Sequence, residues 1–536
     1  MIGRVAIENY RVFRRFDLEL APDVNIIVGK NDTGKSTLIE AIALALTRRL
    51  HGSWFDQELS PYLINQEATR EWVEELAATR PGAAPPTPPE LVIELYFTDI
   101  EDAEVLRGTN NLRNEDACGV RLQARLASDF YAEYMQFVAD PAAVKLVPTE
   151  YYAVELLGFS GNPINTRAVP MVVSLVDPAT ISLRAGVDYH LQEIIGTHLD
   201  PHDRVELTRQ FRSLREEFSS KQAVREINEK LRAEDDDLTD RKLSLSIDIS
   251  KRYTWESNLA AHLDDLPFQL VGKGDQSALK TLLAIGRAAD DAHIILIEEP
   301  ENHLTHTSLR KLLGRIERRC AGKQLVVATH SNYVLNRLGL EHLVLLGDGV
   351  STRASDIPPD TASYFRKLAG YDTLRLVLAD RAILVEGPSD ELVVKRAYRD
   401  KKGKLPIEDG IDVISVGLSH RRFLDLAVRL KRRVWILTDN DGRTLEQMRE
   451  RFSEYLQYDF VTLHTGEDPQ IRTLEPHIVN ANSLEALNAV LGAHHESKED
   501  ALEAMLKDKT TAALAIFDSE TRIVMPKYIQ EVVDGD

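Results

Sequence analysis

Residues 29–36 read GKNDTGKS and follow the pattern G-x-x-x-x-G-K-[ST]. The apolar segment VNIIV precedes this turn and STLIEAIALAL follows it, so the turn lies between an expected strand and an expected helix. In that setting the backbone N–H groups and the positive end of the helix dipole bind phosphates. The lysine reaches the outer phosphates and the serine hydroxyl ligates Mg²⁺. The residues expected to bind ATP with one Mg²⁺ are Gly29, Asn31, Gly34, Lys35, Ser36 and Thr37.

A second segment supports this nucleotide site. IILIEEPENHL, at 294–304, is an apolar run that ends in two acids. Glu298 stands where a magnesium-associated carboxylate is expected, and Glu299 is expected to orient or deprotonate the attacking water. His330 follows the apolar run LVVAT and is expected to sense the γ-phosphate. Each of these residues also suits a purely structural role, but beside the glycine-rich turn they favour an ATPase.

Carboxylates also follow apolar segments in the C-terminal third. Glu386 ends AILVE, and Asp439 and Asp441 end VWILTDND. In open α/β sheets, residues beyond the carboxyl ends of neighbouring parallel strands meet in one crevice. Acids gathered there repel one another unless cations neutralise them, and such oxygen ligands suit Mg²⁺ or Mn²⁺. Either acidic turn alone would be an ordinary solvated turn, but together they predict a metal site.

The elements that position these groups alternate between short apolar runs and helical text, which predicts parallel sheets and an α/β fold. The expected strands are 24–28, 91–97, 294–297, 325–328, 343–345, 382–385, 413–417 and 434–437. The expected first helix is 36–50. Helical text also fills 189–231, where Leu207, Phe211, Leu214 and Phe218 form an amphipathic stripe.

Bulk composition narrows the class of protein. A chain of 536 residues should form two or three domains. The net charge of −20 argues against a surface coated in positive charge, although it allows a local basic groove. Cys118 and Cys320 lie far apart, which argues against a disulfide framework and a thiolate zinc site. With no apolar run long enough to span a bilayer, we expect a cytoplasmic protein without a membrane contact.

The long separation between Lys35 and Glu298 resembles the ABC-type ATPases related to RecF and SMC proteins, as does the opening IENYRVF. In that group a signature segment from a second subunit completes the nucleotide site. The candidate here is VGKGDQSALK at 271–280, with Gly272, Gly274 and Ser277. A plain glycine turn before a helix is the alternative. The resemblance implies a homodimer or tetramer that forms through the ATPase domain and the helical insert.

The C-terminal acids resemble a Toprim domain, with a Glu after the first strand and a later D-x-D. An ABC-type ATPase followed by Toprim resembles the overcoming lysogenisation defect (OLD) family of nucleases, which includes the nuclease subunit of the Gabija antiphage system. Segments FSGNPIN, EEPENHL, ATHS, VEGPSDE, TDNDG and RTLEPHI carry this resemblance. The implied fold is an ATPase domain in two parts, 1–184 and 241–375, separated by a helical insert at 185–240 and followed by Toprim at 376–536.

The resemblance implies an ATP-regulated DNA endonuclease of antiphage defence with a two-metal site in the Toprim domain. The implied metal ligands are Glu386, Asp390, Asp439, Asp441 and Glu475. Lys509 is the expected catalytic lysine, with Lys507 and Lys527 as alternatives. A helicase or a reverse transcriptase is a possible companion in the family. The competing hypotheses are a RecF-like repair ATPase without nuclease activity, and a Toprim strand transferase, which would need a tyrosine nucleophile.

Basic side chains flank the acids in sequence and could contact DNA phosphates, although solvated helix faces explain any one cluster equally well. These side chains are Lys395, Arg396, Arg399, Lys401, Lys402, Lys404, Arg421, Arg422, Arg429, Lys431, Arg432 and Arg433.

Overall fold

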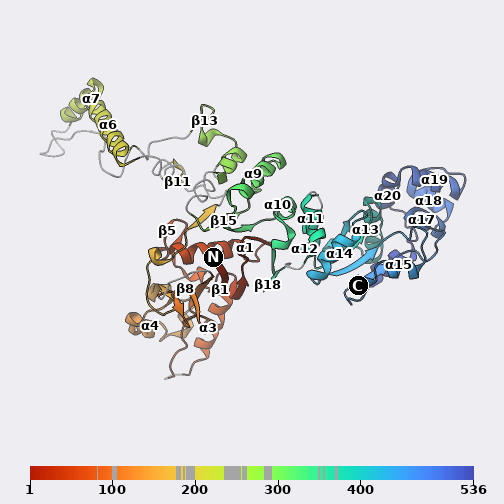
Figure 1. Cartoon of the computed structure of the whole chain (residues 1–536), viewed down its shortest axis with the longest axis horizontal. Helices are drawn as coiled ribbons and strands as arrows, with labels where there is room; N and C mark the ends of the chain where they lie inside the picture. The colour runs from red at the N-terminus through yellow and green to blue at the C-terminus, as the bar shows by residue number, and fades with distance from the viewer. Residues whose placement is uncertain are drawn as a thin grey trace. The chain divides into compact units, whose positions relative to one another are not determined.

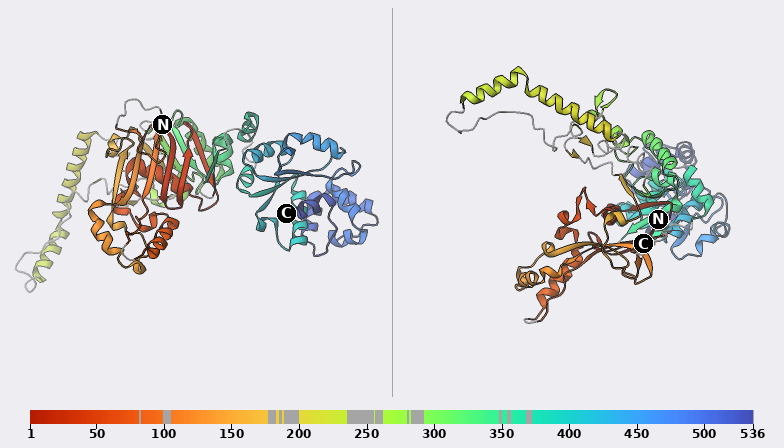
Figure 2. Two further views of the ribbon diagram at one scale, coloured as in Figure 1. Left: turned by 90° about the horizontal axis from the view of Figure 1, so that it is seen from below. Right: turned by 60° about the vertical axis from the view of Figure 1, so that its left-hand side comes forward.

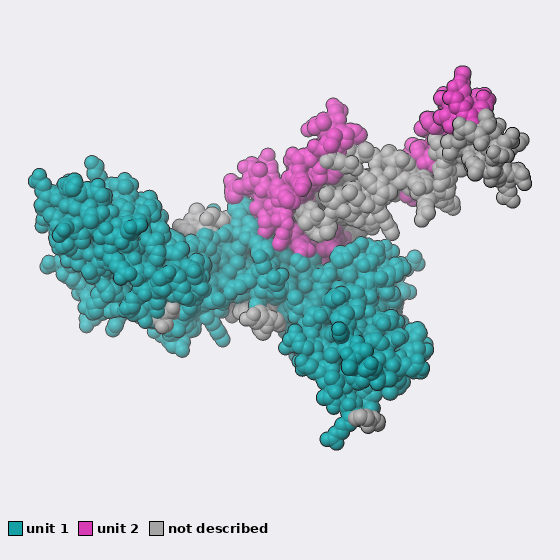
Figure 3. Space-filling view, turned by 180° about the vertical axis from the view of Figure 1, so that it is seen from behind, with its two compact units in different colours: residues 1–168, 326–536 teal, residues 169–325 magenta. Residues whose placement is uncertain are grey.

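The computed structural model divides the chain into two compact units (Figure 3). Unit 1 comprises residues 1–168 and 326–536, and unit 2 comprises residues 169–325. The residues that the structure describes are 1–80, 83–98, 105–176, 183–184, 187–188, 200–234, 255, 262–279, 281–282, 292–347, 350–353, 357–367 and 372–535. The glycine-rich turn and the C-terminal carboxylates belong to unit 1, whereas Glu298 and Glu299 belong to unit 2. The predicted domain boundaries stay predictions.

An antiparallel sheet opens unit 1. Its strands run in the order β2-β1-β6-β8-β7, and β9 also pairs with β8. The bounds are β1 Ile2–Tyr10, β2 Phe13–Glu19, β6 Leu91–Phe97, β7 Arg107–Gly108, β8 Ala117–Leu126 and β9 Tyr152–Gly158. The strand predicted at 91–97 is confirmed, but its antiparallel partners were not foreseen. Because β6 is buried along its whole length, its sequence is a continuous apolar run like that of a parallel strand.

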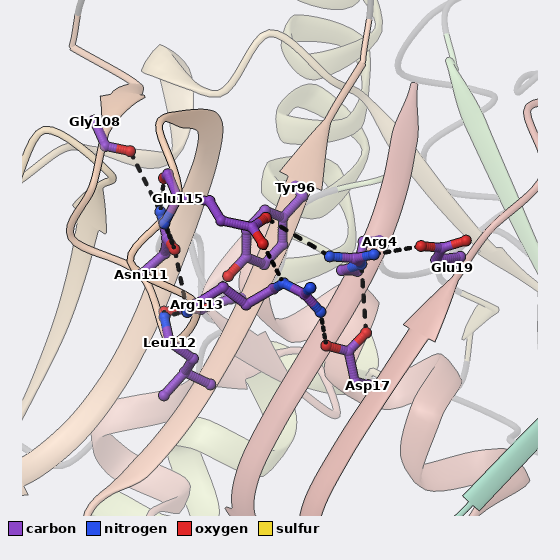
Figure 4. A network of polar contacts seen from close by, with 10 residues as sticks. Arg4, Asp17, Glu19, Tyr96, Gly108, Asn111, Leu112, Arg113 and Glu115 are labelled. Carbon is purple, nitrogen blue, oxygen red and sulfur yellow. Dashed lines mark hydrogen bonds and ion pairs between the residues drawn. The ribbon is translucent and has the colours of Figure 1, made fainter.

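Ionic pairs join β1, β2 and the loop between β7 and β8 at one part of this sheet (Figure 4). Arg4 of β1 pairs with Glu19 and Asp17 of β2. Arg113 Nη1 lies 3.1 Å from Asp17 Oδ2, and its Nε lies 3.0 Å from Glu115 Oε1. Opposite charges on neighbouring strands favour one register, although each exposed pair contributes only about 0.2–1 kcal/mol.

A second sheet in unit 1 carries the nucleotide turn. Strand β3 (Val24–Gly29) pairs in parallel with β17 (Leu343–Gly347), which pairs antiparallel with β18 (Val350–Arg353). Helix α1 (Lys35–Thr47) begins directly after Gly34, which has a φ of 98°. The predicted strand, turn and helix are thereby confirmed in that order.

The C-terminal part of unit 1 is a four-stranded parallel sheet, drawn in blue in Figure 1. Its order is β20-β19-β21-β22, so the two central strands are β19 (Arg381–Val385) and β21 (Arg433–Leu437). The edge strands are β20 (Ile411–Ser415) and β22 (Val461–His464). The connection from β19 leads to one edge and that from β21 leads to the other, so a topological switch point lies between these two strands.

Helices cover both faces of this sheet (Figure 2). Alternate strand residues such as Ile383, Val413 and Trp435 share one core with helices α13 and α17 to α21. Helix α14 contacts β21, and helix α12 contacts β20. The bounds are α12 Thr373–Leu378, α13 Pro388–Lys402, α14 His420–Arg429, α17 Leu474–Ala481, α18 Leu484–Leu491, α19 Lys498–Lys507, α20 Lys509–Asp518 and α21 Lys527–Asp534. Burial on both faces explains why these strands are almost wholly apolar.

Unit 2 contains the predicted helical insert. Helix α6 (Pro201–Ser219) lies within the expected helical stretch 189–231, and α7 (Gln222–Glu234) ends three residues beyond it. Residues 189–199 are outside the described residues. On α6, Leu214 and Phe218 of the predicted stripe are exposed. Unit 2 also contains β10 (Val173–Val176), which pairs in parallel with β15 (Ile294–Glu298), and α9 (His306–Arg319). No helix in the described ranges is long and apolar enough to cross a bilayer.

The prediction that basic side chains near the acids contact DNA is wrong for the buried Arg396, and Arg399 also has a partner within the fold. Arg396, on α13, is 2% exposed, bonds Asp400 and donates to the carbonyls of Ile516, Ser519 and Thr521. Arg399 donates to the carbonyl of Phe517 and stacks on its ring. Both guanidinium groups therefore fasten the end of α20 to α13, and Arg396 also holds the residues just after α20, because the carbonyls at the end of a helix need donors.

Replacing Arg396 should loosen this part of the fold. Arg396→Met leaves Asp400 and the carbonyls of Ile516, Ser519 and Thr521 without this donor, and we expect it to lower the free energy of unfolding by about 3 kcal/mol. Hydrogen exchange of the α13 amides in the full-length chain measures this loss. Lys402→Met, an exposed position on the same helix, is the control. Equal exchange in both variants would contradict a structural role for Arg396.

Candidate active site

The glycine-rich turn has the shape of a phosphate cradle. A Cβ on Gly29 would lie 2.7 Å from the carbonyl oxygen of Leu346, and one on Gly34 would lie 2.5 Å from the ring of Phe13. Lys35 is 7% exposed, and its Nζ donates to the carbonyls of Gly29 (3.1 Å) and Lys30 (2.9 Å). Ser36 is exposed in the first turn of α1, next to the buried Thr37. Asn31 is exposed on the turn. These residues fit a nucleotide phosphate at a helix N-terminus.

In unit 2, the predicted signature segment packs against the residues that follow Glu299. Ser277 is 2% exposed, and its hydroxyl donates to the carbonyl of Asn302 at 3.2 Å. Asn302 in turn donates to Glu299 Oε2 at 2.6 Å. A Cβ on Gly274 would lie 2.6 Å from the carbonyl oxygen of His303, so this close approach requires a glycine. The assignment of residues 271–280 as a signature segment stays a prediction. The structure explains the residue types of Ser277, by its hydrogen bond, and of Gly274, by the close approach of His303.

The remaining predicted nucleotide residues lie at strand ends. Glu298 is the last residue of β15. His330 comes two residues after β16 (Gln324–Ala328) and two before α10 (Asn332–Leu338). Gly272 lies just before the helical residues 273–279, in open space. Because Glu298 and Glu299 belong to unit 2, their meeting with the glycine-rich turn stays a prediction.

The C-terminal carboxylates follow the two central strands at the switch point. Glu386 comes directly after β19, and Asp439 comes two residues after the end of β21. The strands pair in parallel with Leu384 opposite Ile436, so both acids emerge at one edge of the sheet. Asp390 lies in the first turn of α13, where it accepts a bond from the Gly387 N–H at 2.9 Å.

Hydrogen bonds join these acids to one another's segments. The hydroxyl of Thr438, beside Asp439 in the chain, donates to Glu386 Oε1. Glu475, in the first turn of α17, is 4% exposed and accepts a bond from Thr473 Oγ1 at 2.9 Å. Lys509 Nζ lies 3.1 Å from Glu475 Oε2. Thr438 and Thr473 were not predicted, although each stands within two residues of an acid that was.

The electrostatics show that four of the carboxylates share one environment. Burial raises the pKa of Asp439 to about 8, helped by the charges of Asp390, Glu386 and Glu475 and opposed by Lys509. Burial raises the pKa of Asp390 to about 6, with contributions from Glu386 and Glu475. Acids that resist ionisation because they are buried and lie near one another fit a site that holds divalent cations.

Asp441 stands apart from this group. It has a φ of 50°, its side chain is half exposed, and it accepts a bond from Arg443 Nη1 at 3.1 Å. Throughout the described part of the chain, no three His, Cys, Asp or Glu side chains are grouped as ligands around one point. Cation binding therefore requires the carboxylates to draw together.

Of the three candidate lysines, Lys509 is the one that contacts Glu475. Lys527 pairs with Glu467 at 3.0 Å, and Lys507 is exposed at the end of α19. The geometry therefore supports Lys509 as the cation beside the acids, and its catalytic role stays a prediction.

Three family models match the chain. Residues 4–113 match an AAA domain, residues 178–336 match an AAA domain described as a putative AbiEii toxin of a type IV TA system, and residues 377–441 match an overcoming lysogenization defect protein-like TOPRIM domain. The chain thus combines AAA-type ATPase domains with an OLD-like Toprim domain. This domain order matches OLD-family nucleases and confirms the resemblance. The likeness to the Gabija subunit stays a prediction.

Individual relatives match over short stretches. The DNA replication and repair protein RecF of Haemophilus ducreyi is 40% identical over 67 residues, which are 12% of this chain and 18% of RecF. The DNA double-strand break repair Rad50 ATPase of Methanopyrus kandleri is 44% identical over 54 residues, which are 10% of this chain and 6% of that protein. The chain therefore spans less than a fifth of the length of these relatives.

Among solved structures, the SMC head domain from Thermotoga maritima superposes with a TM-score of 0.27 at 14% identity, over 65% of this chain and 97% of that chain. This superposition is too loose to support a conclusion about fold or function. The α/β class rests on the observed strand orders, and the ATPase and Toprim assignments rest on the family models.

The raised pKa of Asp439 predicts a pH-dependent stability of the metal-free protein. In the unfolded chain Asp439 ionises near pH 3.9. In the folded protein it ionises only near its raised pKa of about 8. The stability present at low pH is therefore lost as the pH rises through that window, by up to about 1.4 kcal/mol per pH unit. Asp439→Asn should become progressively more stable than wild type from about pH 5 to about pH 8.

Thermal unfolding in EDTA at both ends of that range measures the difference. Asp441→Asn, at the half-exposed acid paired with Arg443, is the matched control for removal of an acid from the same turn. A difference between Asp439→Asn and wild type that does not change with pH would contradict the shared electrostatic environment.

Proposed function

We propose that the chain is a divalent-metal-dependent DNA endonuclease whose ATPase domain regulates cleavage. The observation that supports this most is the convergence of Glu386, Asp390, Asp439 and Glu475 beyond two adjacent parallel strands, with Lys509 beside them. Their oxygen atoms suit Mg²⁺ or Mn²⁺. Two such ions would activate a water and stabilise the leaving oxygen of a phosphodiester.

The chain's own residues have distinct parts in this proposal. Thr438 and Thr473 orient the carboxylates of Glu386 and Glu475 by donating to one oxygen of each, which leaves the other oxygen for a cation. Lys509 is 45% exposed although its partner Glu475 is buried. Its ammonium group can therefore face a substrate phosphate and offset the negative charge that develops during cleavage. Asp441, half exposed at the rim, is proposed to join the ligands as they close.

Two competing functions are less well supported by the same site. A strand transferase needs an accessible tyrosine nucleophile. Tyr528 is near these acids but is only 6% exposed, and burial and the charges of the acids raise its pKa. A repair ATPase without nuclease activity would leave the convergence of Asp439, Glu386 and Lys509 unused. Incubating supercoiled plasmid with Mg²⁺ or Mn²⁺ separates the three functions. An endonuclease gives nicked or linear DNA, a strand transferase gives relaxed closed circles, and a repair ATPase without nuclease activity leaves the plasmid unchanged.

Removal of a central acid should abolish cleavage. Glu386→Ala deletes one ligand at the switch point, and we expect the nicking rate to fall at least about 100-fold. Glu503→Ala, at an exposed acid on α19, is the control. Plasmid cleavage at wild-type rate by Glu386→Ala would overturn the proposed site.

Contacts inside unit 1 offer a route for nucleotide control. Lys30, on the glycine-rich turn, lies 2.9 Å from Asp380, the residue before β19. Asn332, at the start of α10, accepts a bond from the Leu374 N–H of α12 at 2.6 Å. Arg375 on α12 donates to the carbonyl of Val413 in β20 at 2.7 Å. A change at the nucleotide turn can therefore reach the strands that present the acids.

We propose that ATP occupancy acts as a gate on cleavage rather than as a motor. Lys35→Ala removes the ammonium that would bind the outer phosphates, so its cleavage should not respond to ATP. The measurement is the cleavage rate of wild type and variant across ATP concentrations, with Lys145→Ala at an exposed site as the control. Identical responses of wild type and Lys35→Ala would rule nucleotide control out.

We further propose a role in antiphage defence, assembly into a homodimer or tetramer, and a helicase or reverse transcriptase as a companion. These proposals are supported by the OLD-like domain order and by the exposed apolar side chains on α6.

A further inference from the structure

Asn440 stands between Asp439 and Asp441 but is itself 1% exposed. Its Nδ2 lies 3.1 Å from the carbonyl oxygen of Gly466, 2.8 Å from that of Asp468 and 3.0 Å from that of Ile471. Its Oδ1 accepts a bond from the Gly442 N–H at 2.8 Å. The amide is oriented unambiguously, because the opposite orientation would turn its oxygen toward three carbonyl oxygens. Both N–H protons are therefore used to hold one loop, residues 466–471.

The same loop also contacts the helix that carries Glu475. A Cβ on Gly466 would collide with the imidazole of His477, so the loop backbone lies directly against α17. The loop is also the chain that leads into α17, since Thr473 and Glu475 follow Ile471 within four residues. The Asn440 amide thus connects the end of β21, with Asp439, to the segment that places Glu475.

We propose that Asn440 is a positioning residue that fixes the separation between Asp439 and Glu475, so that only side chains move when a cation binds. This inference rests on the proposed metal site. The two acids come from segments 36 residues apart in sequence, and their mutual repulsion would drive the segments apart. A buried amide shared among three carbonyls opposes that separation at the backbone. Partners that orient metal ligands in this way tune metal affinity.

A merely structural asparagine would have a different effect, and the chain supplies one for comparison. Asn482 is 6% exposed, donates to the carbonyls of Ile478 and Val524 at 2.8 Å each, and accepts from the Val524 N–H at 2.7 Å. It follows the other end of α17. Its burial and bonding resemble those of Asn440, but it joins no two of the acid-bearing segments.

The test is Mn²⁺ binding by the full-length chain without nucleotide or DNA. Binding is measured from the electron paramagnetic resonance signal of the Mn²⁺ that remains free. The variants are Asn440→Ala and Asn482→Ala, with Glu386→Ala as the background for nonspecific binding. We expect Asn440→Ala to bind about 10- to 100-fold more weakly than wild type, and Asn482→Ala to change by less than about threefold. Cleavage by Asn440→Ala should recover at saturating Mn²⁺, because the ligands themselves remain.

Equal Mn²⁺ affinities of Asn440→Ala and wild type, or equal losses in Asn440→Ala and Asn482→Ala, would overturn the positioning role while the metal site stands. Wild type that binds no more Mn²⁺ than Glu386→Ala would overturn the metal site and this inference with it. If circular dichroism shows that Asn440→Ala does not fold, Asn440→Ser, which keeps one donor, is measured in the same way with the same expected direction.

Discussion

Repulsion among carboxylates at the switch point of the C-terminal sheet is the constraint on which the rest of the site depends. Parallel pairing of β19 and β21 delivers Glu386 and Asp439 to one edge, where burial and like charge raise the pKa of Asp439 to about 8. A fold gains nothing in stability from such an arrangement. A divalent cation bound by these carboxylates would offset the repulsion, since such ions take several oxygen ligands.

The surroundings of the acids hold both the backbone and the orientation of two of the carboxylates. Thr438 and Thr473 each use a hydroxyl to steer one carboxylate, and Lys509 provides positive charge at the solvent side. The Asn440 amide anchors the loop that leads to α17. The buried Arg396 has a structural role, because it donates to the carbonyl of Ile516 near the end of α20. The acidic crevice therefore combines hydroxyl and amide anchors with one partly exposed cation.

Local patterns predicted much of this. The strands around Glu386 and Asp439 were visible because they are short, wholly apolar and followed by acids, and the nucleotide turn was visible because its glycines and lysine are contiguous. Contacts between distant segments were not visible. The bonds of Asn440 to residues 466–471 depend on how β21 and the loop meet, and the outward turn of Asp441 depends on a φ of 50°. The antiparallel sheet was hidden because its central strand is buried on both faces.

The most direct test of the account is a crystal structure of the wild-type chain soaked with Mn²⁺, with anomalous diffraction used to locate the ions. The account predicts anomalous density bounded by the carboxylates of Glu386, Asp439 and Glu475, with those side chains drawn closer together than they are here. Density at other acidic surfaces only, or none at saturating Mn²⁺, would contradict it.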